Sequence, residues 1–293
     1  MSSVKKEELK NILPINGPSI EEVKKYIDKY HDEKIVIKCG GSVLIDPNLF
    51  NIFISDIAII KKLGITPTIV HGGGKRINEK LKKLNIESTF IKGLRVTNKD
   101  TIEVVEDVLI KFNKEIVNAL KRNACDAKSI TTRENNIIFV KPERKELEFV
   151  GIPAEIKINA LDEIIKKKIV PIIAPLGLVN NQVYNINADV CSGSLAKDLQ
   201  SRRLLLVTDV EGVLDKNKNL ISEINSSVAE KMLSEGDISG GMIPKINTCL
   251  DAVNNGVTGV VIVDGRKPHS ILFELFSDKG AGTLIRKWKN LKI

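Results

Sequence analysis

The sequence has few residues of the kinds that bind metals or form disulfides. Its 293 residues include three histidines and four cysteines, and the cysteines stand far apart, at Cys39, Cys125, Cys191 and Cys249. There is no C-x-x-C pair and no neighbouring histidine pair, so the pattern argues against a zinc site, and disulfides are not expected. We expect each cysteine to be a small buried apolar side chain.

Aromatic residues and long apolar runs are also scarce. Aromatics make up 4% of the chain, and despite a net charge of +8 the lysines are mixed with glutamates, as in EEVKKYIDKYHDEK. A nucleic-acid partner is therefore not expected, and the positive field favours small anionic substrates. No apolar run reaches transmembrane length, and residues 1–13 lack the apolar core of a signal peptide. We expect no membrane partner and a cytoplasmic location, or an organelle stroma only for an organelle-encoded chain.

Short β-branched runs alternate with helix-like segments along most of the chain. Strands are predicted at residues 34–38, 66–70, 169–174, 203–210 and 259–265, and hairpins between residues 127 and 158. Continuous apolar strands separated by helices indicate a mostly parallel sheet covered on both faces. We predict an α/β fold: an αβα sandwich with an open sheet, in which two lobes share one continuous sheet.

Helical patterns fill the intervals between these strands. Helices are predicted at residues 48–64, 75–84, 100–123 and 159–168, with Gly64 just past the end of the first. Near the N-terminus, Ser19 and Glu22 have capping-box spacing, so another helix is predicted at residues 19–30. Its apolar positions form one stripe, which should dock on another element.

Three glycine-rich turns follow strands or open helices: KCGGS, HGGGK and SGGMIPK. Backbone N–H groups at a helix N-terminus attract anions, and glycine lets an anion approach them closely. One such turn is weak evidence, but each of these three lies beside a lysine: Lys38, Lys75 or Lys245. Together they favour phosphate chemistry.

The common phosphate and hydrolase motifs are missing. There is no G-x-x-x-x-G-K-[ST], which argues against a P-loop enzyme, and no G-x-G-x-x-G between a strand and a helix, which disfavours a dinucleotide-binding domain. HGGG also resembles the oxyanion turn of lipases, but no G-x-S-x-G nucleophile elbow accompanies it.

Seven blocks occur in the order found in the amino acid kinase family: VIKCGGS, IVHGGGKRIN, KGLRVTNKDTIEVVEDVL, YNINADVCSGSLA, LLLVTDVEGVLD, SGGMIPKINTCLDAV and HSILFELFSDKGAGTLI. The resemblance runs from about residue 34 to residue 286. GLRVT and NINAD together resemble the members that phosphorylate the γ-carboxylate of N-acetyl-L-glutamate with ATP, the second step of arginine biosynthesis. The resemblance thus implies a kinase with N-acetyl-L-glutamate and ATP as its substrates.

The resemblance also implies roles for individual residues. Lys38 and Lys245 would neutralise the migrating phosphoryl group, and Asp189 would hold both lysines in place. No general base is needed, because the acceptor carboxylate is already ionised. Without the resemblance, the simpler interpretation of Asp189 is an acidic residue that stabilises the N-terminus of a helix.

The acceptor would be held by the second glycine turn and by two polar side chains. By resemblance, Gly73 and Gly74 donate backbone N–H groups to the carboxylate that is phosphorylated, and a Cβ on Gly73 would occupy the volume of the substrate. Arg95 would pair with the α-carboxylate through its planar fork, and Asn185 would add a hydrogen bond.

For the nucleotide, the resemblance points to residues in three turns. Gly41 would donate its N–H to the phosphoryl group, and the remaining expected ATP contacts are Asp209, Gly212, Leu214, Gly240 and Gly241. Mg²⁺ is expected to bridge the β- and γ-phosphates, and no acidic cluster predicts a metal site made by the protein itself.

The two ends of the chain resemble those of arginine-inhibited family members. The resemblance implies that L-arginine inhibits by contacting His269, Glu274, Gly280 and Gly282. The helix at residues 19–30 would pair between dimers, giving a homo-oligomer that is a dimer or a hexamer built as a trimer of dimers. The alternative is a surface helix that covers its own sheet. A PII signalling protein is a partner of some members, and nothing in this sequence demonstrates one.

The expected organisation has three parts: an N-terminal extension at residues 1–33, an acetylglutamate-binding and dimer-forming lobe at residues 34–200, and an ATP-binding lobe with the regulatory segment at residues 201–293. Two alternatives stay open. One is a sibling kinase acting on a longer acylated amino diacid, with its selectivity set by residues 92–97 and 127–158. The other is a non-catalytic nucleotide-binding regulator.

Overall fold

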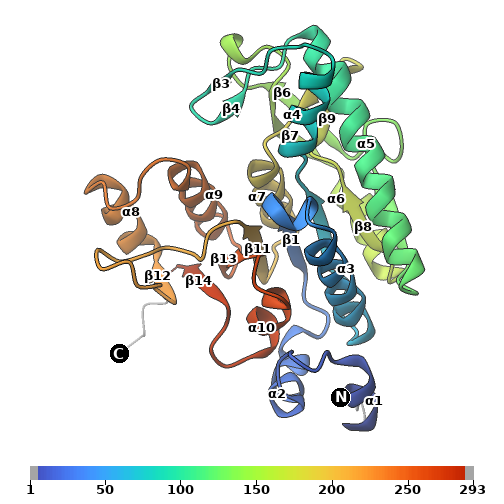
Figure 1. The fold of residues 1–293 in the computed structure, drawn as a ribbon, viewed down its shortest axis with the longest axis vertical. Coiled ribbons are helices and arrows are strands. Elements are labelled where there is room, and N and C mark those ends of the chain that lie inside the picture. The colour runs from blue at the N-terminus through green and yellow to red at the C-terminus, as the bar shows by residue number, and fades with distance from the viewer. Residues whose placement is uncertain (1–5, 288–293) are drawn as a thin grey trace.

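A computed structural model describes residues 6–287, and its centre is an eight-stranded sheet in the order β12-β14-β13-β11-β1-β2-β8-β5 (Figure 1). Neighbouring strands run parallel except for the antiparallel pair β13 and β14. The strands are β1 (Ile35–Cys39), β2 (Thr68–His71), β5 (Ala127–Ile130), β8 (Val170–Ile173), β11 (Arg203–Thr208), β12 (Glu223–Asn225), β13 (Val260–Asp264) and β14 (Gly282–Arg286). All residues of β1, β2, β8 and β13 are buried, as predicted from their continuous apolar runs.

Helices cover both faces of this sheet, which confirms the αβα sandwich. On one face, α3 (Pro47–Lys62), α5 (Lys99–Arg122) and α10 (Ser270–Phe276) share a core with Ile35 and Ile37 of β1. On the other face, α6 (Ile158–Lys166), α7 (Ala188–Asp198), α8 (Ser226–Ser234) and α9 (Met242–Asn254) share a core with Val36. Alternate residues of β1 therefore serve opposite cores, as the pleat of a strand requires.

A second sheet of four strands lies beside the first, in the order β10-β9-β6-β7. Its strands are β6 (Ile138–Pro142), β7 (Gly151–Ile156), β9 (Leu176–Val179) and β10 (Gln182–Asn185), and a small hairpin is formed by β3 (Phe90–Ile91) and β4 (Leu94–Arg95). The hairpin predicted between residues 127 and 158 is confirmed for β6 and β7. The prediction is wrong for β5, which belongs to no hairpin and instead pairs parallel to β8 at the edge of the main sheet. The run is only four residues long, so its pattern did not distinguish the two pairings.

The N-terminal region consists of α1 (Lys6–Ile12) and α2 (Ile20–Tyr30). Ser19 and Glu22 form the predicted capping box at the start of α2. The apolar stripe of α2 does dock: Val23, Ile27 and Tyr30 are buried, and the Tyr30 ring meets Phe276 of α10 edge-on, with ring centroids 6.3 Å apart. The helix therefore packs on the segment that the sequence assigned to arginine.

The main sheet runs without a break through the two predicted lobes. β1 pairs parallel to β11 over five residue positions, from Ile35 opposite Arg203 to Cys39 opposite Val207. Figure 1 shows α8, α9 and β12–β14 on one side of this junction and α3, α4 (Gly74–Lys83) and α5 on the other. The two halves are thus fixed to each other through backbone hydrogen bonds at the centre of the sheet.

Two smaller expectations concern cysteines and membranes. All four cysteines are buried free thiols, which confirms their expected role as small apolar side chains. Within residues 6–287, no helix combines the length and the apolar character needed to cross a membrane.

Gly282 gives a test of the sheet packing. It lies opposite Val263 of β13, and a Cβ at this position would lie 1.9 Å from the carbonyl oxygen of Ile262. We expect Gly282→Ala to lower the free energy of unfolding by about 1–3 kcal/mol, because the two strands must move apart. Urea unfolding measures the change. Gly241→Ala is the control, because a Cβ there has no atom within 4 Å, and equal losses in the two variants would contradict this explanation.

Candidate active site

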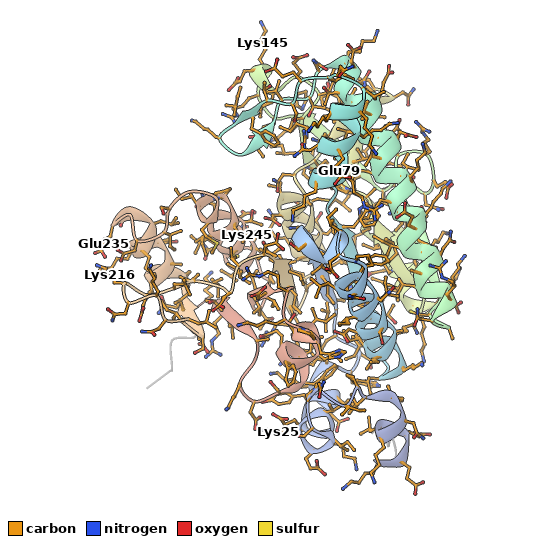
Figure 2. The ribbon with its side chains drawn as sticks, in the orientation of Figure 1. Lys25, Glu79, Lys145, Lys216, Glu235 and Lys245 are labelled. Atoms are coloured by element: carbon orange, nitrogen blue, oxygen red, sulfur yellow. The ribbon has the colours of Figure 1, made fainter. Side chains whose placement is uncertain are left out.

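Lys38, Asp189 and Lys245 meet where the two halves of the molecule join. Val36 of β1 faces α7 and α9, and Lys38, two residues later, faces the same way. Asp189 lies in the first turn of α7, where the Asn187 side chain caps the helix by accepting the N–H groups of Asp189 and Val190. Lys245 lies in the first turns of α9, and Figure 2 shows it at this junction. Three separate elements thus deliver the three side chains to one point.

Asp189 is shared between the two lysines. The Nζ atom of Lys38 lies 2.9 Å from Oδ1, and the Nζ atom of Lys245 lies 2.7 Å from Oδ2. Each lysine is only 8% exposed. One carboxylate therefore stands between two buried ammonium groups that would otherwise repel each other.

The electrostatics of Asp189 follow from this arrangement. Burial by itself would raise the pKa of its carboxyl, but the charges of Lys38 and Lys245 outweigh burial and hold the pKa well below its ordinary value. Asp189 is therefore a permanent anion. The contact with Lys245 is a hydrogen bond, whereas that with Lys38 is an ion pair without hydrogen-bond alignment.

The first glycine turn is closed by Asp209, which follows β11. The Oδ1 atom of Asp209 accepts the backbone N–H of Ser42 at 2.6 Å. Gly41 has a φ of +68°, and a Cβ there would lie 2.3 Å from the same oxygen. Glycine is required at position 41 for both reasons. Burial would raise the pKa of Asp209, but the Ser42 N–H and Lys75 outweigh it and lower the pKa.

The second glycine turn is held by His71 and Asn113. The Asn113 amide donates to the Nε2 atom of His71 at 3.2 Å, so Nδ1 carries the proton and donates to the Gly72 carbonyl at 2.9 Å. Burial lowers the pKa of His71 to about 4, so the ring is neutral at pH 7. His71 therefore fixes the turn by hydrogen bonds and carries no charge there.

Gly73 corrects one expectation. A Cβ on Gly73 would lie 2.5 Å from the Cδ2 atom of Leu109, so a side chain of the protein itself, not a substrate, occupies that space. At Gly74 no atom lies within 4 Å of the Cβ position, and this glycine faces open space. Glycine at position 73 is thus explained by close packing against α5. Glycine at position 74 leaves the backbone open to a ligand.

Arg95 is a buried cation without a carboxylate partner among the described residues. It is 7% exposed, and its guanidinium donates to Ser88 Oγ, to Asn78 Oδ1 at 2.6 Å and to the Gly74 carbonyl at 3.4 Å. The Phe90 ring lies 4.7 Å from its Cζ atom. Burial lowers the pKa of Arg95, and no neighbouring acid counters this shift. A buried and uncompensated guanidinium favours an anionic ligand.

A cleft of about 230 Å³ connects these features. It is lined by both glycine turns together with Lys38, Arg95, Leu109 and Asn185. Asn185, at the end of β10, donates to Thr97 Oγ1 at 3.3 Å. The structure therefore brings the predicted phosphoryl, acceptor and α-carboxylate contacts to one cavity.

The other residues predicted to contact ATP do not line this cleft. Gly212 packs so closely on β14 that a Cβ would lie 2.4 Å from Thr283 Oγ1. Leu214 is 40% exposed. Gly240 and Gly241 precede α9, and a Cβ on either glycine has no atom within 4 Å. Of these positions, Gly240 and Gly241 directly precede the helix that carries Lys245.

No group of three or more histidines, cysteines or acidic residues between residues 6 and 287 has the geometry of a metal site. Asp189 is committed to two lysines, and Asp209 to Ser42 and Lys75. The described acidic side chains of the site are therefore not arranged as the ligands of a resident metal ion.

The predicted arginine contacts separate into two groups. Glu274 and Gly280 lie together: Glu274 accepts the Ala281 N–H at 2.8 Å, and a Cβ on Gly280 would lie 2.9 Å from the same oxygen. Burial raises the pKa of Glu274. His269 faces away toward α3, where its Nδ1 bonds Asp56 at 2.7 Å and makes no side-chain cap. Gly282 is explained by strand packing.

Several residues that build the site were missed by the sequence analysis. Ser88 and Asn78 hold Arg95, Asn113 orients His71, and Asn187 caps α7. Asn187 stands two residues before Asp189 in NINAD, and the spacing typical of an Asn N-cap was a signal for its role. Asn78 and Asn113 act on residues 17 and 42 positions away, which no local pattern records, and Ser88 stands seven positions before Arg95 without a recognisable motif.

Comparisons with known proteins identify the family. Residues 33–264 match the amino acid kinase family. Acetylglutamate kinase from Pelagibacter ubique is 63% identical over 288 residues, which cover 98% of this chain and 100% of that protein.

Solved structures show the same fold. N-acetylglutamate synthase from Neisseria gonorrhoeae, complexed with coenzyme A and either N-acetyl-glutamate or L-arginine, has TM-scores of 0.84 and 0.81 at 21% and 20% identity. The matches cover 93% and 92% of this chain but only 64% and 66% of that one. Carbamate kinase from Giardia lamblia bound to AMP-PNP has a TM-score of 0.66 at 17% identity, with 87% of this chain and 99% of that chain covered. The chain belongs to the amino acid kinase family and, within it, to the acetylglutamate kinases.

Proposed function

We propose that this enzyme transfers the terminal phosphoryl group of ATP to the γ-carboxylate of N-acetyl-L-glutamate, the second step of arginine biosynthesis. The product is N-acetylglutamyl 5-phosphate. The observation that carries the proposal is the convergence of Lys38 and Lys245 on Asp189, next to a cleft that holds an uncompensated Arg95. The 63% identity to an acetylglutamate kinase supports the choice of substrate.

In the proposed mechanism the chain supplies position and positive charge. Lys38 and Lys245 neutralise the charge that spreads over the phosphoryl oxygens in the transition state, and Asp189 keeps the two ammonium groups 2.9 and 2.7 Å from its own oxygens. The acceptor carboxylate is already a nucleophile, so no side chain removes a proton. The N–H groups of the glycine turns bind and orient the two reacting groups.

ATP is the co-substrate of this kinase, and we propose that Gly41, Asp209, Gly212, Leu214, Gly240 and Gly241 surround it. The exposed Leu214 offers an apolar surface for the base, and the open backbone at Gly240 and Gly241 offers N–H groups to phosphates. Mg²⁺ is expected to accompany ATP and would add positive charge at its phosphates.

The experiment that tests the function is an assay of ADP release with a panel of acceptors. N-acetylglutamate, an N-acetylaminoadipate-like homologue, free glutamate and free aspartate distinguish the proposed substrate from its relatives. Activity confined to the longer homologue would identify the sibling kinase. Absence of ADP release with every acceptor would favour a nucleotide-binding regulator.

Asp189→Asn should reduce turnover far more than it reduces folding. Two ammonium groups then face a neutral amide, so they are no longer held together around the phosphoryl group, and we expect kcat to fall roughly 100-fold or more. Steady-state kinetics and thermal unfolding measure the two effects separately. Asp251→Asn is the matched control, because it breaks a 2.6 Å ion pair with Lys197 between the same two helices. Parallel losses of melting temperature and activity in Asp189→Asn would indicate a structural role alone.

Arg95→Lys should weaken acetylglutamate binding selectively. Lysine keeps the charge but loses the planar fork, so we expect KM for acetylglutamate to rise about tenfold while KM for ATP stays within about twofold. Arg133→Lys, at an exposed ion pair with Glu106, is the control. Equal changes in both KM values would contradict the assignment of Arg95 to the acceptor site.

We further propose that L-arginine inhibits this enzyme by pairing with Glu274. This carboxylate is largely shielded from water, makes no ion pair with another described residue, and lies under α2, whose Lys25 and Tyr26 both contact Asp278. The N. gonorrhoeae synthase of the same fold has been solved with L-arginine. Gly280 and Gly282 would shape the pocket, whereas His269 would act from the start of α10, where its ring contacts Asp56 of α3.

Glu274→Gln should abolish inhibition by arginine and leave the uninhibited rate unchanged. The amide keeps the size of the side chain but loses the charge that would bind a guanidinium, so we expect the inhibitory concentration to rise at least about tenfold. Glu235→Gln, at an exposed pair with Lys231, is the control. Inhibition of Glu274→Gln at the wild-type arginine concentration would place the effector elsewhere.

Assembly, organisation and location stay predictions. We propose a homo-oligomer, either a dimer or a hexamer with α2 at the contact between dimers, with a PII protein as a further partner to be tested. The division of the chain into residues 1–33, 34–200 and 201–293 is also a proposal. The cytoplasmic location is likewise proposed.

A further inference from the structure

Lys75 is a lysine in an electrostatically unfavourable place. It is the second residue of α4, at the end of the helix where backbone N–H groups make the field positive. A cation there is destabilised, and a neutral or acidic residue is preferred. The sequence marks Lys75 as the third lysine beside a glycine turn, and the proposed function gives it no role.

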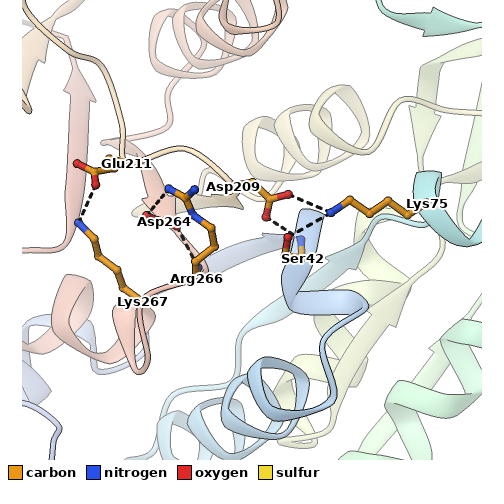
Figure 3. A network of polar contacts seen from close by, with 7 residues as sticks. All are labelled: Ser42, Lys75, Asp209, Glu211, Asp264, Arg266 and Lys267. Atoms are coloured by element: carbon orange, nitrogen blue, oxygen red, sulfur yellow. Dashed lines mark hydrogen bonds and ion pairs between the residues drawn. The ribbon is translucent and has the colours of Figure 1, made fainter. Parts of the chain in front are cut away.

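The ammonium group of Lys75 crosses from the second glycine turn to the first. It lies 3.2 Å from Ser42 Oγ and 3.3 Å from Asp209 Oδ2, as Figure 3 shows. Ser42 directly follows Gly40 and Gly41, the turn proposed to hold the transferring phosphoryl group. Lys75 therefore reaches from the acceptor side of the cleft to the donor side.

The bond that holds Lys75 is weak. Its side chain is 51% exposed and that of Asp209 34% exposed, and pairs in contact with water are screened. Asp209 would also keep a hydrogen bond without Lys75, because its other oxygen accepts the Ser42 N–H. The ammonium group can leave Asp209 at little cost when a stronger anion arrives.

The neighbouring cations have other partners. Arg266 is held more firmly, by two 2.9 Å hydrogen bonds to the buried Asp264, and Lys267 pairs with Glu211 at 3.6 Å within the same half of the molecule (Figure 3). The buried pair Lys38 and Lys245 is balanced in part by Asp189, which leaves one net positive charge between them. A triphosphate carries far more negative charge than this.

We propose that Lys75 is a third cation of the phosphoryl-transfer site, resting on Asp209 and Ser42 in the free enzyme and contacting the terminal phosphate oxygens when ATP binds. The inference rests on the proposed function for the location of the nucleotide. It assigns Lys75 to the nucleotide rather than to the acceptor, because both of its present partners lie on the donor side of the cleft.

The test compares Lys75→Met, which removes the charge but keeps the length of the stem, with Lys75→Arg, which keeps the charge. In the full-length enzyme we expect Lys75→Met to raise KM for ATP by roughly three- to tenfold, the effect of one partly screened phosphate contact. KM for acetylglutamate should stay within about twofold, and Lys75→Arg should recover most of the loss. Lys80→Met, at an exposed site on the same helix, should change neither value.

A double-mutant comparison separates contact with ATP from an effect through Asp209. If Lys75 touches the nucleotide, Lys75→Met still raises KM for ATP in an Asp209→Asn background, although the factor can differ because the two side chains are in contact. If Lys75 only holds Asp209 in place, the second substitution adds nothing, and the proposal is overturned. It is also overturned by an unchanged KM for ATP, by an equal effect of Lys80→Met, or by a change confined to acetylglutamate.

Calorimetric titration with a non-hydrolysable ATP analogue and with ADP keeps this test independent of the proposed acceptor. Lys75→Met should weaken binding of the analogue more than binding of ADP, because the proposed contact is with the terminal phosphate. Because only nucleotides are titrated, this measurement tests the Lys75 contact even if acetylglutamate is not the substrate. Equal weakening of both ligands, or of neither, argues against the assignment.

Discussion

The sharing of one buried carboxylate by two lysines is the interaction on which the rest of the site depends. Asp189 can hold Lys38 and Lys245 only when α7, α9 and the end of β1 are packed together. Two buried ammonium groups without a counter-ion would be strongly destabilising, so the pairing also constrains the fold. The parallel contact of β1 with β11 meets this constraint by keeping the two halves in fixed register.

The charges around the cleft are arranged to leave positive charge for a ligand. Asp189 is committed to the two lysines, and Arg95 is held by a hydroxyl, an amide, a carbonyl and an aromatic ring. These neutral partners orient the guanidinium without cancelling its charge. An anion that enters the cleft therefore finds donors already in place, and little reorganisation is required of the protein.

Most of the fold could be predicted from the sequence because its signals are local. Continuous β-branched runs predicted the central strands, and the capping-box spacing of Ser19 and Glu22 predicted where α2 begins. The pairing of β5 could not be read from four residues, since a strand at a sheet edge and one in a hairpin have the same pattern. Likewise, Lys75 and Asp209 are 134 positions apart, and only the folded sheet brings the glycine turns that carry them together.

The glycines show why a motif can be recognised correctly and explained incorrectly. Gly41, Gly73 and Gly74 all lie in phosphate-type turns, but Asp209 occupies the Cβ position of the first and Leu109 that of the second. Only Gly74 faces open space. Glycine at positions 41 and 73 therefore lets the protein pack against its own backbone, which fixes the direction of the neighbouring N–H groups before any ligand binds. The Ser42 N–H is already bonded to Asp209, so the first turn has its shape in the free enzyme. Glycine in these turns thus provides rigidity as well as access, and rigidity is what the positioning of two reacting anions requires.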